Sequence, residues 1–319
     1  MGKSPRNKTI DTTVEEGKEY LELCLRIEDL QGNLHDDFQE DLQAAIDIHA
    51  DAVINGDCFE VLPMLPANSV DLVIADPPYN MEKNYNGKRF SRMAIEEYEA
   101  YLRKWLALVK PLMKENASIY VCCDWESSLV TGRVLNELFH VRNRITWQRE
   151  KGRGASANWK NSMEDIWFAT KSDEYTFNLD DVKLRRKVIA PYRQEGEPKD
   201  WVESEEGNYR DTCPSNFWDD ITIPFWSMPE NTAHPTQKPE KLIARLILAS
   251  SNPDDMVLDP FLGSGTTSVT ASKLGRHYIG IEIDERYCIW AQQRLQRAKA
   301  DKTIQGYEDG VFWERNARR

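Results

Sequence analysis

The chain has 319 residues, of which 40% are hydrophobic and 29% charged. This length is sufficient for one large core, with or without a modest appended lobe. No apolar run approaches the length of a membrane span, and the N-terminus is too polar for a secretory signal. The six cysteines are scattered, with no CxxC pair and no histidine cluster near them, which argues against a structural zinc site or a disulfide framework. We therefore expect a globular cytoplasmic protein that needs no metal.

The net charge of −12 is unusual for a protein that binds nucleic acid, but the charge is unevenly distributed. Residues 1–50 contain five Lys or Arg against twelve Asp or Glu, whereas residues 142–193 contain twelve Lys or Arg against seven Asp or Glu. Attraction to phosphate depends mainly on the local surface that a protein presents. The total charge therefore weakens a prediction of nucleic-acid binding without excluding it.

The first fifty residues are an acidic, polar extension with helical periodicity. Helices are predicted over residues 14–30 and 38–48. Their acidic faces are compatible with a solvated appendage or with a helix that docks a partner. No pattern of residues in this extension indicates chemistry.

From residue 52 the pattern changes to short apolar runs that alternate with amphipathic segments. Residues 178–233 lose this periodicity and gain Trp, Pro and charge, which indicates an inserted lobe. Strands alternating with crossover helices predict an α/β fold, with a mainly parallel sheet and helices on both faces. The predicted strands are 53–54, 70–75, 118–123, 145–147, 166–169, 256–258 and 277–282, with a hairpin between 145–147 and 166–169, and the predicted helices are 98–113, 129–138, 239–250, 266–274 and 285–299.

The most informative motif is Asp76-Pro77-Pro78-Tyr79, directly after the predicted strand 70–75. Its two prolines make a stiff turn and leave nearby carbonyls as acceptors. The Asp76 carboxylate and the Pro77 carbonyl can accept the two hydrogens of an exocyclic base amine, which localises the nitrogen lone pair for in-line attack on a methyl group. Asp76 can also take up the released proton, and Tyr79 offers a face for stacking. A base within a duplex must first be flipped out.

A second motif, at residues 261–265, joins a predicted strand to a predicted helix through a glycine turn. Gly263 and Gly265 let the backbone pass close to a ligand, and the helix start offers N–H groups to a negatively charged group. Glu282 ends the next strand, where it can accept hydrogen bonds from a ribose diol. Asp57 can similarly accept from an adenine amine. The full GxGxxG dinucleotide pattern is absent, so we expect a nucleoside cofactor with a compact tail.

With the DPPY motif first and the FxGxG motif near the C-terminus, the chain resembles the β class of amino-DNA methyltransferases of bacterial and phage restriction–modification systems. The resemblance covers residues 51–300. It implies a Rossmann-like methyltransferase fold, S-adenosylmethionine as the methyl donor, and an exocyclic amine in double-stranded DNA as the acceptor. The expected segments are an acidic helical extension at 1–50, a catalytic half at 51–177, a target-recognition region at 178–233, a cofactor-binding half at 234–300 and a C-terminal tail at 301–319.

The form of the catalytic motif bears on the target base. DPPY is more typical of methylation at the 6-amino group of adenine, and SPPY of methylation at the 4-amino group of cytosine. Adenine is therefore the predicted base and cytosine the alternative. An RNA or protein-amide methyltransferase is a further alternative, disfavoured by the late position of the cofactor motif. A catalytically silent DNA-binding or assembly subunit is the alternative from another class, and the intact Asp76, Tyr79, Gly263 and Gly265 argue against it.

Further segments resemble family motifs that contact the cofactor. The stretch 234–239 is similar to the segment at the methionine part, and its Thr236 can cap the following helix. The stretch 55–58 resembles the motif at the adenine, Glu282 matches the ribose-binding acid, and Asp259 is implied at the methionine amino group. Residues 114–118 depart from the family, which often has a glycine-rich turn there. The implied cofactor-binding residues are Asp57, Cys58, Asp76, His234, Thr236, Lys238, Asp259, Phe261, Gly263, Ser264, Gly265, Thr266 and Glu282.

Two basic segments are candidates for DNA contact. Residues 149–160 combine Arg and Lys with two glycines and Trp159, which suits phosphate contact beside a flipped base. The polar segment after the catalytic motif is expected to close over the target base or the DNA backbone, and residues 183–187 and 201–226 are candidates for sequence reading. Besides DNA, the partners considered are a second copy of the chain and a cognate restriction endonuclease. The predicted DNA-binding residues are Lys83, Lys88, Arg89, Arg149, Lys151, Arg153 and Lys160.

Overall fold

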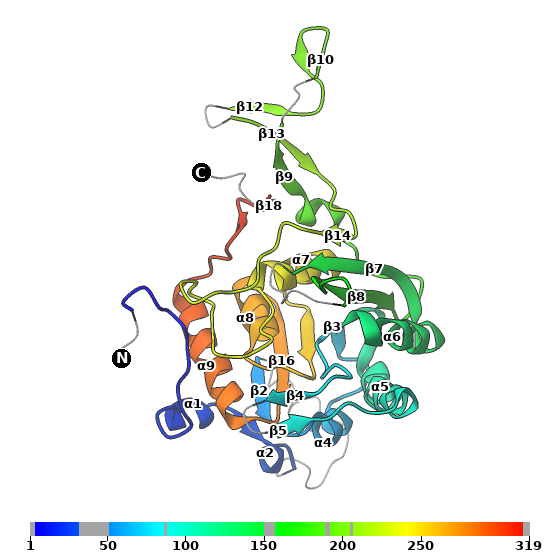
Figure 1. Cartoon of the computed structure of the whole chain (residues 1–319), viewed down its shortest axis with the longest axis vertical. Helices are drawn as coiled ribbons and strands as arrows, with labels where there is room; N and C mark the ends of the chain where they lie inside the picture. The colour runs from blue at the N-terminus through cyan, green and yellow to red at the C-terminus, as the bar shows by residue number, and fades with distance from the viewer. Residues whose placement is uncertain are drawn as a thin grey trace.

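The computed structural model describes residues 4–31, 51–85, 88–149, 157–188, 192–204 and 207–314, and a nine-stranded sheet forms its centre (Figure 1). In spatial order the strands are β1 (Leu25–Arg26), β2 (Ala52–Asn55), β16 (His277–Glu282), β15 (Met256–Asp259), β3 (Val70–Ala75), β6 (Met113–Cys123), β8 (Met163–Thr170), β7 (His140–Gln148) and β14 (Phe217–Trp218). Neighbouring strands are parallel except at β8, which runs antiparallel to both β6 and β7. The predicted mainly parallel sheet is therefore confirmed.

Helices cover both faces of this sheet. Successive side chains of a strand point to opposite faces, so Leu72 and Ile74 of β3 pack into one hydrophobic cluster and Val73 and Ala75 into the other. A strand buried on both faces is expected to be an almost continuous apolar run, as β3 is. The first cluster includes residues of α7 (Glu240–Ser250), α8 (Thr266–Lys273) and α9 (Glu285–Ala300), and the second includes residues of α4 (Cys58–Val61), α5 (Ile95–Val109) and α6 (Trp125–Leu138).

Every strand predicted for the sheet is present, and β7 and β8 form the predicted antiparallel hairpin. The five helices predicted from residue 98 onward are also present, as α5 to α9. Helix α5 begins three residues before its predicted start and gives way, through the 3-10 turn η2 (Lys110–Leu112), to β6 at Met113. Another 3-10 turn, η1 (Leu62–Met64), follows α4. No helix within the described ranges has the length and apolar character required to cross a lipid bilayer.

The prediction of a continuous helix over residues 14–30 is wrong. The structure has two short helices, α1 (Lys18–Leu21) and α2 (Ile27–Gln31), with β1 between them, and the other predicted helix, at 38–48, lies outside the described residues. Helix α9 binds the backbone within this segment and just before it: the Leu23 carbonyl accepts a hydrogen bond from Gln292 Nε2 (3.1 Å), and the Thr12 carbonyl accepts one from Trp290 Nε1 (2.9 Å). Tertiary contacts therefore override local helical periodicity here.

A second, five-stranded sheet projects from the body as an arm (Figure 1). Its order is β12 (Val202–Ser204), β13 (Gly207–Thr212), β9 (Leu184–Lys187), β18 (Val311–Trp313) and β17 (Tyr307–Glu308). Strand β18, near the C-terminus, thus pairs with β9 of the predicted target-recognition region, and β17 pairs with β18. The remaining described elements are η3 (Leu179–Val182) and two small hairpins, β4 (Lys83–Tyr85) with β5 (Lys88–Phe90) and β10 (Arg193–Gln194) with β11 (Glu197–Pro198).

Candidate active site

One cavity of about 380 Å³ lies at the carboxyl ends of the central strands. Adjacent parallel strands end at the same edge of a sheet, which is where open α/β sheets bind ligands. Asp57 follows β2, Glu282 ends β16, Asp259 ends β15 and Asp76 follows β3. Two motifs that are far apart in the chain therefore meet: the DPPY turn and the glycine turn line the same cavity. All predicted catalytic and cofactor-binding residues line it except Gly265: Asp57, Cys58, Asp76, Pro77, Pro78, Tyr79, His234, Thr236, Lys238, Asp259, Phe261, Gly263, Ser264, Thr266 and Glu282.

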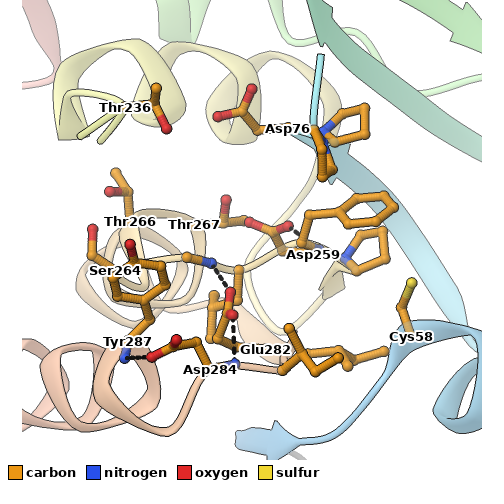
Figure 2. A pocket seen from close by; sticks show the side chains of 18 of the residues that line it. Cys58, Asp76, Thr236, Asp259, Ser264, Thr266, Thr267, Glu282, Asp284 and Tyr287 are labelled. Carbon is orange, nitrogen blue, oxygen red and sulfur yellow. Dashed lines mark hydrogen bonds between the residues drawn. The ribbon is translucent and has the colours of Figure 1, made fainter. Parts of the chain in front are cut away.

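Glu282 is held by the backbone of two neighbouring turns (Figure 2). Its Oε2 accepts a hydrogen bond from the Gly263 N–H (2.7 Å), and its Oε1 accepts one from the Asp284 N–H (2.8 Å). Burial raises the pKa of Glu282 to about 7, against the opposing effect of these two hydrogen bonds. The carboxylate is thus oriented before any ligand arrives, and it has lone pairs for a diol.

Gly265 has a different role from the one predicted. Its φ of +86° is a left-handed conformation, and a Cβ at this position would lie 2.6 Å from the Cβ of Ala291 in α9. Gly265 therefore allows the start of α8 to pack against α9, and it does not line the cavity. The close approach that the structure shows at Gly265 is between two parts of the protein, and its contact with a ligand stays a prediction. Gly263, with φ +55°, does face the cavity and lies beside His234.

Asp259 is buried, and it lies between Asp76 and Glu282 along the sheet edge because β15 lies between β3 and β16. Its Oδ1 accepts a hydrogen bond from the Phe261 N–H (3.0 Å). Burial raises the pKa of Asp259 to about 7, so a nearby cation would favour its ionised form. Phe261 in turn packs edge-on against Trp105, with ring centroids 5.3 Å apart. The sequence motif thus places an acid at the cavity and anchors the following turn in the core.

The stretch 234–239 borders the cavity, and its His234 packs against α9. The His234 ring lies edge-on to Tyr287, with centroids 4.4 Å apart, and its Nδ1 accepts a hydrogen bond from the Thr236 N–H (3.3 Å). The predicted cap is wrong: Pro239 precedes α7, and no side chain of this stretch caps the helix. Glu230 instead accepts a hydrogen bond from the Glu240 N–H (2.8 Å), which frees Thr236 to line the cavity (Figure 2).

The catalytic motif belongs to a charge cluster, defined here as Asp76, Glu164, Lys238 and Arg149, in which Glu164 and Lys238 are buried. Lys238 Nζ donates to Asp76 Oδ2 (2.6 Å) and lies 3.3 Å from Glu164 Oε2, while Arg149 forms an ion pair with Glu164. The Tyr79 hydroxyl lies 2.8 Å from Asp76 Oδ1 and 3.3 Å from Glu164 Oε2. Burial alone would lower the pKa of Lys238, but Asp76 and Glu164 raise it above its ordinary value. The cluster is therefore formally neutral.

The charge cluster also contains what sequence reasoning missed. Glu164 was not predicted, although an acidic residue inside an otherwise buried strand is a signal for a paired charge. Arg149 was predicted to contact phosphate, but its guanidinium binds Glu164, so it is not a free basic surface group. Other unpredicted residues that line the cavity are the aromatic side chains Phe59, Phe90, Tyr101 and Tyr287.

The remaining predicted DNA-binding residues are only partly described. Lys160 is exposed, beside Trp159, whose exposed fraction is 97%. Lys151 and Arg153 lie outside the described residues, as do the side chains of Lys83, Lys88 and Arg89 in the β4–β5 hairpin. In the arm, Arg185 of β9 forms a two-pronged pair with Asp211 (2.8 and 2.7 Å).

A stiff carboxylate-bearing turn that shares one cavity with a glycine turn and Glu282 is the arrangement expected of a methyltransferase that acts on amino groups. The chain belongs to the N6/N4 DNA methylase family, whose model, described as DNA methylase, matches residues 70–293. It is 35% identical over 256 residues to the DNA adenine methyltransferase YhdJ of Escherichia coli (strain K12), which covers 78% of this chain and 84% of that protein. It is 33% identical over 246 residues to the type II methyltransferase M.HpaI of Haemophilus parainfluenzae, which covers 76% and 73%.

Solved structures share the fold. The PvuII DNA methyltransferase, which is cytosine-N4-specific, matches with a TM-score of 0.55 at 18% identity, over 79% of this chain and 92% of that one. The protein TTHA0409 of Thermus thermophilus, solved with S-adenosyl-L-methionine, matches with a TM-score of 0.52 at 23% identity, over 84% and 99%. The fold is thus the Rossmann-like methyltransferase fold, and the chain is an S-adenosylmethionine-dependent DNA amino-methyltransferase of the restriction–modification type.

Proposed function

We propose that the chain methylates the 6-amino group of adenine in DNA, at a specific sequence, after the base has been flipped out of the duplex. The observation that carries this proposal is the single cavity joining the DPPY turn to Glu282 and the glycine turn. The DPPY form of the motif and the 35% identity to a protein named as an adenine methyltransferase support adenine over cytosine.

The residues around the cavity suit the cofactor. S-adenosylmethionine supplies, when bound, a methyl group that a sulfonium charge makes electrophilic. Glu282 would accept hydrogen bonds from its ribose hydroxyls, Asp259 would hold its ammonium group, and Asp57 and Cys58 would hold its adenine. The acids fit this ligand because it carries positive charge and hydroxyl donors, and because both carboxylates are already oriented by backbone N–H groups.

The DPPY turn acts on the target base. The Asp76 carboxylate and the Pro77 carbonyl accept the two amine hydrogens, which favours a pyramidal nitrogen with a localised lone pair, and holding that nitrogen in line supplies much of the acceleration. Asp76 takes up the proton that the amine then releases. The Tyr79 hydroxyl donates to Asp76 and orients it, and the Tyr79 ring borders the cavity where a flipped base would stack.

The experiment is methyl transfer from tritiated S-adenosylmethionine to duplex DNA of mixed sequence, followed by digestion to nucleosides. Label in N6-methyladenine is the expected result, and an Asp76→Asn protein, which keeps the shape of the side chain, should lose nearly all of it. Label only in N4-methylcytosine would assign the enzyme to the cytosine class. Single-molecule sequencing of DNA from cells expressing the protein then gives the modified base and its recognition sequence together.

Contacts outside the cavity remain predictions. We infer phosphate contacts from Lys83, Lys88, Arg89, Lys151, Arg153 and Lys160, each of which, when replaced by Gln, should weaken binding to all sequences alike and reduce its salt dependence. The target-recognition region at 178–233, a homodimer, a cognate endonuclease and a cytoplasmic location are likewise predictions from the sequence.

A further inference from the structure

The catalytic carboxylate already has donors on both of its oxygens. Lys238 Nζ lies 2.6 Å from Asp76 Oδ2, and the Tyr79 hydroxyl lies 2.8 Å from Asp76 Oδ1. The Lys238 side chain is only 6% exposed, so this contact is part of the packed interior and not a passing surface contact. An amine that approaches Asp76 would therefore meet an ammonium group at the same oxygen.

This arrangement is unsuited to methyl transfer. A nitrogen that attacks an electrophilic methyl group gains positive charge as the new bond forms. A neighbouring ammonium opposes that charge, because like charges at close range in a buried site repel strongly. Lys238 also competes directly with the amine hydrogen for Asp76 Oδ2. Lys238 must therefore leave Asp76 before the reaction that we propose above.

Glu164 provides a second counter-ion that allows Lys238 to leave. Its Oε2 lies 3.3 Å from Lys238 Nζ, so the ammonium remains paired when it moves away from Asp76. Arg149 binds the other oxygen, Oε1, which anchors the carboxylate from the opposite side. Glu164 is itself only 3% exposed. A lysine has a flexible four-carbon stem, so a small rotation can exchange these partners.

The cavity indicates what draws Lys238 away. Among the described residues that line it, Lys238 is the only lysine or arginine, whereas its other charged side chains include Asp57, Asp259 and Glu282. A cofactor with an amino-acid tail brings one carboxylate into this acidic cavity. Lys238 is the cation available to pair with it, and Thr266 of the glycine turn donates to the Lys238 carbonyl (3.0 Å), which ties the two segments together.

We propose that Lys238 covers the catalytic carboxylate until the carboxylate of the bound cofactor draws it away, and that Glu164 is the positioning residue that holds its charge during this exchange. The inference rests on the proposed function, since it concerns the same amine. Cofactor binding and target-base binding are then coupled: each favours the arrangement in which Asp76 is uncovered.

The test measures this coupling by binding alone. The dissociation constant of a fluorescein-labelled duplex carrying the recognition sequence is measured by anisotropy, without ligand and with saturating S-adenosylhomocysteine, which carries the carboxylate but no transferable methyl group. Uncovering a charge-assisted hydrogen bond should tighten duplex binding roughly tenfold or more. Saturating methylthioadenosine, which lacks the carboxylate, should tighten it little. Equal effects of the two ligands on the unaltered protein would overturn the proposal.

Two variants test the residues in opposite directions. Lys238→Met, of similar length but uncharged, should bring the ratio of the two dissociation constants close to one. Glu164→Gln should increase the ratio above that of the unaltered protein, because Lys238 then has Asp76 as its remaining carboxylate partner in the cluster. A merely structural role for either residue would weaken binding with and without ligand alike, leaving the ratio unchanged. Thermal unfolding establishes that each variant is folded.

The outcome is separable from that of the proposed function. If the protein labels adenine, but the ratio of the two dissociation constants depends neither on Lys238 nor on the ligand carboxylate, this inference alone is refuted. A protein that labels no adenine refutes the proposed function, whereas the coupling can still be measured with whichever amine-bearing base is modified. A duplex with purine, which has no amine, at the target position should show no coupling in either case.

Discussion

Arg294 of α9 connects three segments that shape the cofactor side of the cavity. It is 3% exposed. Its Nη1 donates to the Ser264 carbonyl (2.8 Å) and to Thr266 Oγ1 (2.9 Å), and its Nη2 donates to Glu240 Oε1 (3.0 Å). One guanidinium thus fixes the glycine turn, the start of α8 and the start of α7. We expect Arg294→Met to loosen all three.

The magnitude follows from the partners that remain. Removing one member of a buried charge pair costs about 3–5 kcal/mol. Glu240 keeps a second cation, because Lys273 Nζ lies 2.7 Å from its Oε2, so we expect the lower end, about 3 kcal/mol. For a chain of 319 residues that corresponds to a fall in Tm of about 4–5 °C. Because the glycine turn loses its support, cofactor affinity should fall as well.

Urea unfolding measures the first effect, and calorimetric titration with S-adenosylhomocysteine measures the second. Arg297→Met is the matched control, since Arg297 is an exposed arginine on the same helix. It should change stability by less than about 0.5 kcal/mol and leave cofactor affinity unaltered. Equal losses in the two variants would refute the reasoning. A loss of stability without a loss of affinity would show that Arg294 does not support the turn.

Two further predictions concern the same region. Gly265→Ala should lower the free energy of unfolding by about 3 kcal/mol, because of its left-handed conformation and the collision with Ala291. Gly275 has a φ of +70° but open space around it, so Gly275→Ala should cost about 1 kcal/mol. Similar losses for the two variants in urea unfolding would contradict the packing role of Gly265. Asp259 and Glu282 both have a pKa raised to about 7, so without cofactor their contribution to stability is greatest below the unfolded value near 4 and is lost as the pH rises through 7. Cofactor binding uses the ionised carboxylates, so the Kd of the cofactor should decrease as the pH rises to about 7 and stay constant above it. Calorimetric titrations from about pH 5.5 to 8.5 measure this dependence, and a constant Kd over that range would contradict the prediction. Asp259→Asn should remove part of the pH dependence.

The central sheet was predictable because its strands are buried on both faces. The run at residues 70–75 coincides with β3, and the run at 277–282 coincides with β16. Strands buried on both faces are mostly apolar, so their boundaries are clear in the sequence. The motifs also predicted where the site lies. Asp76 and Glu282 stand at the ends of strands, and in a parallel sheet such ends lie at the same edge. Local pattern and the geometry of parallel strands together were sufficient to expect one cavity.

What could not be predicted depends on contacts between distant segments. The acidic pattern of residues 14–30 is that of a helix, but α9 binds the Leu23 carbonyl within this segment and the Thr12 carbonyl just before it, and the backbone follows another path. Strand β9 pairs with β18, from beyond residue 300, and short polar strands of this kind have no local signature. Glu164 was missed because its role depends on ion pairs with Lys238 and Arg149, which come from other parts of the chain.

The net charge of −12 is compatible with a DNA substrate once the acidic residues are located. Several are buried in neutral or cationic clusters, as Asp220 is with Arg245 and Lys241, and such pairs add little to the field outside the protein. Others line the cavity, where a cofactor that carries positive charge requires them. The acidic residues that line the cavity do not face phosphate, because duplex DNA is too large to enter a cavity of about 380 Å³. Only a base flipped out of the duplex can reach Asp76. Phosphate attraction therefore depends more on the loops around the cavity mouth than on the formal charge of the whole chain.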